Sequence, residues 1–155
     1  MVTIAVAALN AAACALPGFV AGSDFYAPNT DDKSIPTFAE AQARYAKTPA
    51  GPPWSPAFKC VPMANRKSSQ VVESWARENP NAAPWAVGVI GGVLPVSDSA
   101  GCEEGCAGHC LVFQPTREGP DAPIVLRLYD PQTPGFLNLD DWDTVTEIYD
   151  MRLAA

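Results

Sequence analysis

The sequence contains few of the residue types on which most active sites depend. It has a single histidine, His109, and only 17% of its residues are charged, against about 25% in an average soluble domain. The glycine-rich run 85–96 is followed by no lysine, so the G-x-x-x-x-G-K-[ST] phosphate loop is absent. The chain also lacks a paired-carboxylate signature. These absences exclude a P-loop nucleotide site and favour a protein that is not an enzyme.

Basic residues are also scarce. There are 10 of them against 17 acidic residues, which gives a net charge of −7 at neutral pH. A nucleic-acid-binding face needs a concentration of cations to neutralise phosphates, so we expect no nucleic-acid partner. Only the segment 33–77 has an excess of basic residues. This segment is either an ordinary solvated surface or a docking surface for an acidic protein or lipid partner.

Proline, in contrast, is abundant, with 16 among 155 residues, about twice the usual share. Because proline fixes φ and has no N–H donor, it works against long uninterrupted elements. A chain of this length is of single-domain size and can bury a core. We expect short helices and strands joined by rigid, proline-rich loops.

The first 22 residues carry no charge. They are interpreted as an apolar anchor, signal-like or membrane-inserted segment, with a packed core element as the alternative. The remaining residues, 23–155, are expected to form one small domain. The apolar side chains predicted to contact a membrane or a partner are Val2, Ile4, Val6, Leu9, Leu16, Phe19 and Val20.

Two segments carry helix signals. Thr37 and Glu40 have the spacing of a capping box, which predicts a helix over 38–47. An apolar stripe that includes Trp75 predicts a second helix over 69–78. Between these helices, prolines flank the segment 56–63, which is therefore predicted to be an extended edge or loop that holds Cys60.

The C-terminal segment is ambiguous. Its β-branched residues favour a strand, whereas the spacing of Trp142, Val145, Ile148 and Tyr149 favours a helix, which is our prediction. Four oxygen-bearing residues precede or open this segment: Asn138, Asp140, Asp141 and Asp143. Because the EF-hand glycine and glutamate are missing, helix capping by these carboxylates is preferred to a calcium site.

Three apolar runs have the character of strands. They cover 85–96, 111–113 and 124–129, and the connections between the runs predict an antiparallel meander. The predicted fold class is therefore α+β. It has a small antiparallel sheet of about three or four short strands, two or three short helices, proline-rich loops and disulfide staples, with Trp75, Trp85 and Trp142 in or near the core.

The cysteines suggest covalent cross-links. If Cys14 belongs to an anchor or signal, four cysteines remain: Cys60, Cys102, Cys106 and Cys110. Four cysteines allow three pairings, and each of them joins Cys60 to one member of the cluster at 102–110. A loop of roughly 40–50 residues closed in this way would stabilise the fold by about 4 kcal/mol. Disulfide bonding is the preferred interpretation.

Three other readings of the same residues stay open. The first is zinc, held by four ligands drawn from Cys60, Cys102, Cys106, His109 and Cys110, although the spacing is a weak match to known zinc knuckles. The second is a nucleophilic cysteine–histidine pair, which His109 and Cys110 do not favour, because adjacent side chains diverge. The third is a set of free buried thiols. The spacings of iron–sulfur and c-type haem sites are absent.

By elimination, the sequence predicts a non-catalytic accessory or structural subunit, extracytoplasmic, secreted or lumenal. It would be held at a membrane or in a larger protein assembly and would need no cofactor. One alternative is a zinc-binding module that uses Cys60 and the 102–110 cluster. A second is a small secreted enzyme of unknown reaction, which would require His109 to lie beside a nucleophile or a metal.

Overall fold

The structure is a computed structural model that describes residues 1–29, 31–53, 55, 59–94, 109–137 and 147–155. Within this part of the chain there are eight strands and three helices. The helices are α1 (Val6–Cys14), α2 (Phe38–Lys47) and α3 (Cys60–Glu78). The strands are β1 (Val2–Ile4), β2 (Phe19–Tyr26), β3 (Lys33–Ile35), β4 (Gly88–Val93), β5 (His109–Thr116), β6 (Val125–Asp130), β7 (Gly135–Phe136) and β8 (Glu147–Leu153).

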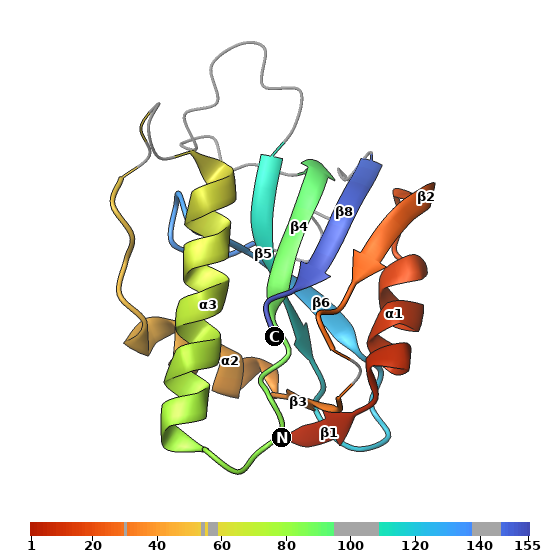
Figure 1. Cartoon of the computed structure of the whole chain (residues 1–155), viewed down its shortest axis with the longest axis vertical. Coiled ribbons are helices and arrows are strands. Elements are labelled where there is room, and N and C mark those ends of the chain that lie inside the picture. Colours follow the sequence, from red (N-terminus) through yellow and green to blue (C-terminus); the bar gives the residue numbers. More distant parts are fainter. Residues whose placement is uncertain (30, 54, 56–58, 95–108, 138–146) are drawn as a thin grey trace.

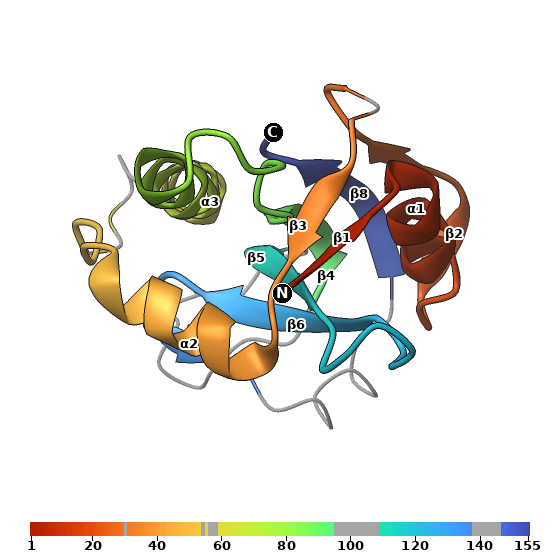
Figure 2. The same cartoon turned by 90° about the horizontal axis from the view of Figure 1, so that it is seen from below.

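A six-stranded sheet forms the centre of the molecule, with the strand order β2-β8-β4-β5-β6-β7 (Figure 1). Its neighbours pair antiparallel, apart from β2 and β8, which run parallel. The strands β1 and β3 form a separate antiparallel pair. Seen from below, α1 lies on one side of the large sheet and α2 and α3 lie on the other (Figure 2).

Alternation along the strands builds a separate core on each face of the sheet. In β5, Leu111 and Phe113 point into the cluster that contains Leu9 of α1, whereas Cys110 and Val112 point into the cluster that packs against α2 and α3. Successive side chains of a strand face opposite ways, so a strand covered on both faces is buried throughout. Every residue of β5 is buried accordingly.

The second core cluster is rich in aromatic rings. Trp75 and Trp85 are both buried, as predicted, with ring centroids 5.1 Å apart. The indole N–H of Trp85 donates to Gln114 Oε1 at 2.7 Å, and the Gln114 amide donates to two backbone carbonyls. This buried amide is thus fully used, as a polar group in an apolar core requires. Trp142 lies outside the described residues.

The prediction of a small three- or four-stranded sheet is wrong, although the three predicted strands do pair antiparallel as β4, β5 and β6. The sheet is larger because three further strands join it: the short edge strand β7 and two strands from segments assigned elsewhere. β2 comes partly from the apolar N-terminal run, and β8 comes from the segment predicted to be helical. β8 lies between β2 and β4, so it is hydrogen-bonded on both sides. This pairing outweighs the helical spacing of Ile148 and Tyr149.

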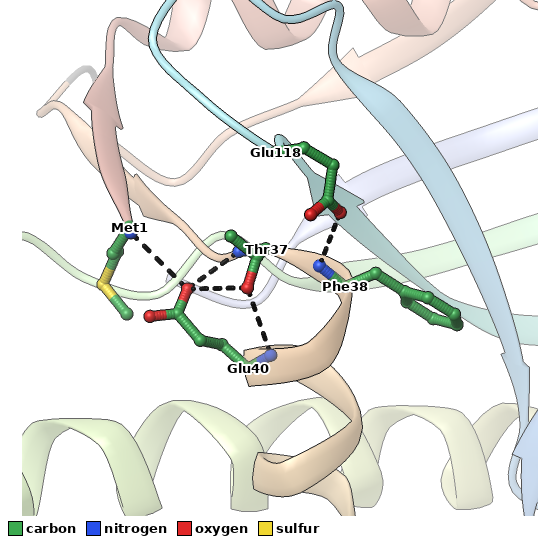
Figure 3. A network of polar contacts seen from close by, with 5 residues as sticks. All are labelled: Met1, Thr37, Phe38, Glu40 and Glu118. Atoms are coloured by element: carbon green, nitrogen blue, oxygen red, sulfur yellow. Dashed lines mark hydrogen bonds and ion pairs between the residues drawn. The ribbon is translucent and has the colours of Figure 1, made fainter.

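The helix predicted at 38–47 is confirmed as α2, and its capping box is present. The Thr37 hydroxyl accepts a hydrogen bond from the Glu40 amide at 3.3 Å, and the Glu40 carboxylate accepts from the Thr37 amide at 2.8 Å. Figure 3 shows that Glu118 extends this network, accepting from the amide of Phe38 at 2.9 Å, and that the amino group of Met1 lies 3.5 Å from Glu40. The start of α2 is therefore fixed to the loop that follows β5.

The helix predicted at 69–78 begins nine residues earlier than expected, at Cys60. The extended conformation predicted for 56–63 is wrong from Cys60 onward. Pro62 falls in the first turn, where backbone N–H groups have no partner within the helix. A proline there removes no helical hydrogen bond. This extension turns Cys60 from a loop residue into the first residue of a helix.

The apolar segment 1–22 takes part in the fold. Ile4 and Leu9 are buried in the first core cluster, and Val2, Val6, Leu16 and Phe19 pack against it partly buried. Most of the side chains predicted to contact a membrane or a partner thus contact the protein core, and the side chain of Val20 is not described. No helix in the described part of the chain has the length and hydrophobicity needed to span a bilayer.

Candidate thiol site at one end of the sheet

Three chemically versatile side chains meet at one end of the molecule. Cys60 is the first residue of α3, His109 is the first residue of β5, and Asp130 is the last residue of β6. Because β5 and β6 pair antiparallel, the start of one lies at the same edge as the end of the other. Figure 1 shows the first turn of α3 at this end of the sheet, beside the start of β5. The fold thus brings a thiol, an imidazole and a carboxylate together from three separate segments.

Cys60 is half-buried, and its thiol is free. The side chain of His109 lowers the pKa of the Cys60 thiol, against the opposing effect of burial, and the backbone N–H groups of Cys110 and Val61 lower it further. The N-cap of the helix, Lys59, makes no side-chain capping bond. The partial positive charge at the start of α3 is therefore free to stabilise a thiolate. Cys60 has the surroundings of a reactive cysteine.

His109 is buried, with 5% of its surface exposed. Burial alone lowers the pKa of an imidazole, but the Asp130 carboxylate and the Cys60 thiol more than offset it and raise the pKa of His109 to about 9. The nearest approach to the carboxylate is 4.0 Å, between Nε2 and Oδ2 of Asp130, longer than a hydrogen bond. Within the described residues neither ring nitrogen has a hydrogen-bond partner. The ring is thus held by packing and charge, with both nitrogens open to a proton transfer.

Asp130 is fully buried and is oriented by the turn that follows β6. Its Oδ1 atom accepts from the backbone amide of Gln132 at 2.8 Å and from that of Thr133 at 3.4 Å. With Oδ1 held by the backbone, Oδ2 is the oxygen that faces His109. The short turn therefore fixes which side of the carboxylate meets the imidazole.

Cys110 contrasts sharply with Cys60. It follows His109 directly but faces the second core cluster, and burial raises the pKa of its thiol to about 12. A buried thiol with a raised pKa is chemically inert. Cys60 packs against the same cluster, but its thiol is only half-buried and the side chain of His109 lowers its pKa.

The predicted disulfide staples are not present among the described residues. Cys14, Cys60 and Cys110 are all free thiols. The core is large enough to explain why no staple is required, since two clusters of buried side chains cover both faces of a six-stranded sheet. The other two candidates, Cys102 and Cys106, lie outside the described residues, as do Asn138, Asp140, Asp141 and Asp143.

The zinc alternative is not tested by the structure. In the described part of the chain no group of three or more histidine, cysteine or acidic side chains is arranged to hold a metal ion. A zinc site built on Cys60 and His109 would draw its remaining ligands from the segment that contains Cys102 and Cys106, which is not described.

Sequence reasoning connected Cys60 and His109 only as candidate zinc ligands and not as a nucleophile and its base. The pairing depends on the antiparallel register of β5 and β6 and on the early start of α3. A local signal did exist: Cys60 comes one residue before Val61-Pro62, and a proline in this position is typical of a first helical turn. A cysteine that opens a helix, in a chain with one histidine, was sufficient reason to weigh the two residues together.

Comparison with known proteins gives a fold and no family. No family model matches the chain, and no curated protein sequence matches it. Among solved structures, one described as a PSL1a–E64 complex aligns with a TM-score of 0.70 and 15% identity, covering 97% of this chain and 50% of that one. A second is a Polyporus squamosus lectin bound to the human-type influenza-binding epitope Neu5Acα2-6Galβ1-4GlcNAc. It aligns with a TM-score of 0.69 and 18% identity, covering 97% of this chain and 49% of the lectin.

The chain therefore spans about half the length of the solved structures that it matches. At 15–18% identity the likeness shows the fold alone. The picture of a disulfide-linked, membrane-associated accessory subunit is corrected, because the described cysteines are free and the structures with this fold include a lectin. A role in an assembly, and an extracytoplasmic or lumenal location, stay predictions.

Proposed function

We propose that this chain carries a thiol-dependent catalytic site for acyl transfer, in which Cys60 is the nucleophile, His109 the general base and acid, and Asp130 the residue that positions the imidazole. The convergence of these three side chains carries the proposal. It departs from the expectation of a non-catalytic subunit and develops the alternative of an enzyme in which His109 lies beside a nucleophile.

The electrostatics suit this chemistry. The pKa of Cys60 is lowered and that of His109 is raised, so each group shifts the other toward its charged form, thiolate or imidazolium. Thiolate is the reactive form of cysteine. Since Nε2 of His109 faces Asp130, Nδ1 is the nitrogen left to exchange a proton with the sulfur.

The reaction follows from these roles. The Cys60 thiolate attacks the carbonyl carbon of an ester or amide, and the imidazolium of His109 gives its proton to the leaving alcohol or amine. A thioester on Cys60 results. Water then attacks the thioester while His109 takes up the proton of the water, which releases the acid and restores the thiolate and imidazolium. Each step transfers one proton through His109 and replaces one bond to the carbonyl carbon by another. Water is the only reactant besides the substrate.

The direct test is covalent labelling. E64, which one of the solved neighbours holds, is an epoxide that alkylates thiolates, and the modified residue can be mapped by peptide mass spectrometry. We expect E64 or iodoacetamide to modify Cys60 first in the native protein. Cys60→Ala should lose this fast labelling, whereas Cys110→Ala is the matched control and should keep it.

A substrate readout completes the test. An activated ester such as a p-nitrophenyl ester should give a burst of p-nitrophenol equal to the enzyme concentration, followed by slower turnover, because acylation precedes hydrolysis. Cys60→Ala should abolish the burst. A Cys60 that reacts no faster than a thiol in the denatured chain would rule the proposal out.

A further inference from the structure

A second candidate site lies away from the thiol, between α2, α3 and the edge strands β6 and β7. It is a pocket of about 810 Å³ whose walls include Phe38, Tyr45, Lys67, Arg127, Tyr129 and Phe136. This volume is within the range of pockets that bind small molecules, roughly 300–1,000 Å³. Lys67 lies seven residues after Cys60 on α3, about two helical turns or ~10 Å along the axis. The pocket is therefore distinct from the proposed thiol site.

Lys67 is a buried cation without an acidic partner. Only 6% of its surface is exposed, and no carboxylate of the described residues forms an ion pair with it. Its Nζ atom contacts the Thr48 hydroxyl, the Thr48 carbonyl at 3.3 Å and the Tyr45 carbonyl at 3.5 Å. The last two contacts are long, and all three acceptors are neutral. Burial accordingly lowers the pKa of Lys67.

Aromatic rings surround this ammonium. Nζ of Lys67 lies 5.6 Å from the ring centroid of Tyr45 and 5.3 Å from that of Tyr129. Ring faces attract a cation, but they do not supply a negative charge. The ammonium at the pocket wall therefore retains a net positive field.

The Tyr45 hydroxyl is an unsatisfied group of the same pocket. Tyr45 is 4% exposed and lines the pocket, and its oxygen has no hydrogen-bond partner among the described residues. Burial, together with the Tyr129 phenol, raises the pKa of Tyr45 well above its usual range, so the hydroxyl keeps its proton and can donate. A buried polar atom without a partner costs free energy, and a bound acceptor would remove that cost.

Arg127 adds a second positive charge. Its guanidinium lies 4.2 Å from the ring centroid of Phe38, and its Nε donates to the Thr116 hydroxyl at 3.4 Å. The described residues give it no ion pair, and none of those that line the pocket is acidic. The pocket thus combines two cations and a free hydroxyl donor with four aromatic rings.

We propose that this pocket binds a small aromatic carboxylate, whose ring packs among the aromatic side chains and whose carboxylate lies between Lys67, Arg127 and the Tyr45 hydroxyl. The carboxylate would supply the negative charge and the acceptor that the described residues lack. Aromatic walls with a few convergent polar groups are the usual composition of such a site. The inference does not depend on the chemistry of Cys60.

The test compares two probes of the same shape. Titration calorimetry with 2-naphthoate and with naphthalene-2-carboxamide separates the contribution of the charge from that of the ring. We expect naphthoate to bind the wild-type chain at least about tenfold more tightly, because a contact with a charged group outweighs a neutral one by roughly that factor. Lys67→Met and Arg127→Gln should each remove most of the difference, and Tyr45→Phe should weaken naphthoate binding severalfold.

The controls make the result specific. Arg77→Gln removes an exposed cation of the same helix, with 80% of its side chain in solvent, and should leave naphthoate binding unchanged. Cys60→Ser should also leave it unchanged, so the pocket and the thiol site can fail separately. Thermal unfolding shows whether each variant folds. If Lys67→Met does not fold, Arg127→Gln and Tyr45→Phe still test the proposal. Equal affinity for the two probes, or no binding at millimolar concentration, would overturn the proposal.

Discussion

His109 Nε2 lies 4.0 Å from Oδ2 of Asp130, and both side chains are shielded from solvent. An imidazole and a carboxylate this close, out of water, stabilise each other's charged forms. The same imidazole lowers the pKa of Cys60. The Asp130 carboxylate at the end of β6 therefore stabilises the imidazolium of His109, and His109 in turn stabilises the thiolate of Cys60 at the start of α3.

The first prediction concerns the reactivity of Cys60. His109→Asn should return the thiol pKa toward its ordinary value, because the largest cause of the lowering is lost. The rate of alkylation near pH 6.5 should then fall, since a higher pKa leaves a smaller fraction of the thiol as thiolate. Asp130→Asn should cause a smaller fall. The measurement is the pH profile of iodoacetamide labelling, and identical profiles for all three proteins would contradict the triad.

The second prediction concerns stability against pH. The pKa of His109 is about 9 in the folded chain, against 6.5 as the ordinary value. A raised pKa contributes stability that is complete below pH 6.5 and is lost as the pH rises through about 9. We expect the free energy of unfolding to fall by on the order of 1–3 kcal/mol over this window.

Urea unfolding at several pH values measures this effect. The comparison is made with Cys60 in place, because the Cys60 thiol is one of the groups that raise the pKa of His109. His109→Asn should flatten the profile between pH 6.5 and 9.5. An unchanged slope would mean that the imidazolium is not stabilised in the folded state.

The third prediction uses three glycines of one strand. A Cβ on Gly88 would come within 3.0 Å of the Arg152 carbonyl oxygen and of the Phe113 ring, and one on Gly92 would meet the backbone of Glu147 equally closely. We expect Gly88→Ala and Gly92→Ala each to destabilise the chain by about 2–4 kcal/mol, because backbone atoms cannot yield without disturbing the sheet. Gly91 is the control, since a Cβ there meets nothing within 4 Å. Gly91→Ala should change stability by less than about 1 kcal/mol.

The fourth prediction concerns the start of α2. Thr37→Ala removes one half of the capping box and should cost about 1 kcal/mol in the free energy of unfolding. Glu40→Gln should cost less than Thr37→Ala, because the side-chain oxygen of the glutamine can still accept a hydrogen bond from the backbone N–H of Thr37. Glu73→Gln is the control. Its ion pair with Arg77 is exposed on both sides, and such pairs contribute less than about 0.5 kcal/mol.

Features set by near neighbours in sequence were predictable. The capping box at Thr37 and Glu40 predicted the start of α2, and three apolar runs predicted β4, β5 and β6. Features set by distant segments were not. Whether Ile148 lies in a helix or a strand depends on β2 and β4, which bond β8 from both sides. The contact of Cys60 with His109 likewise depends on how α3 lies against β5, whereas Pro62 indicated only that a helix could begin near Cys60.

The position of β8 has a consequence for biosynthesis. Among the strands of the large sheet β8 comes last in the chain, yet it lies between β2 and β4 and joins them. A nascent chain can assemble β4, β5 and β6 as the ribosome releases them, whereas β2 has no sheet to join until residues 147–153 have emerged. β2, the first strand of the large sheet, therefore pairs only after β8 has been synthesised. Until then the edge of β2 is unpaired and can bind chaperones.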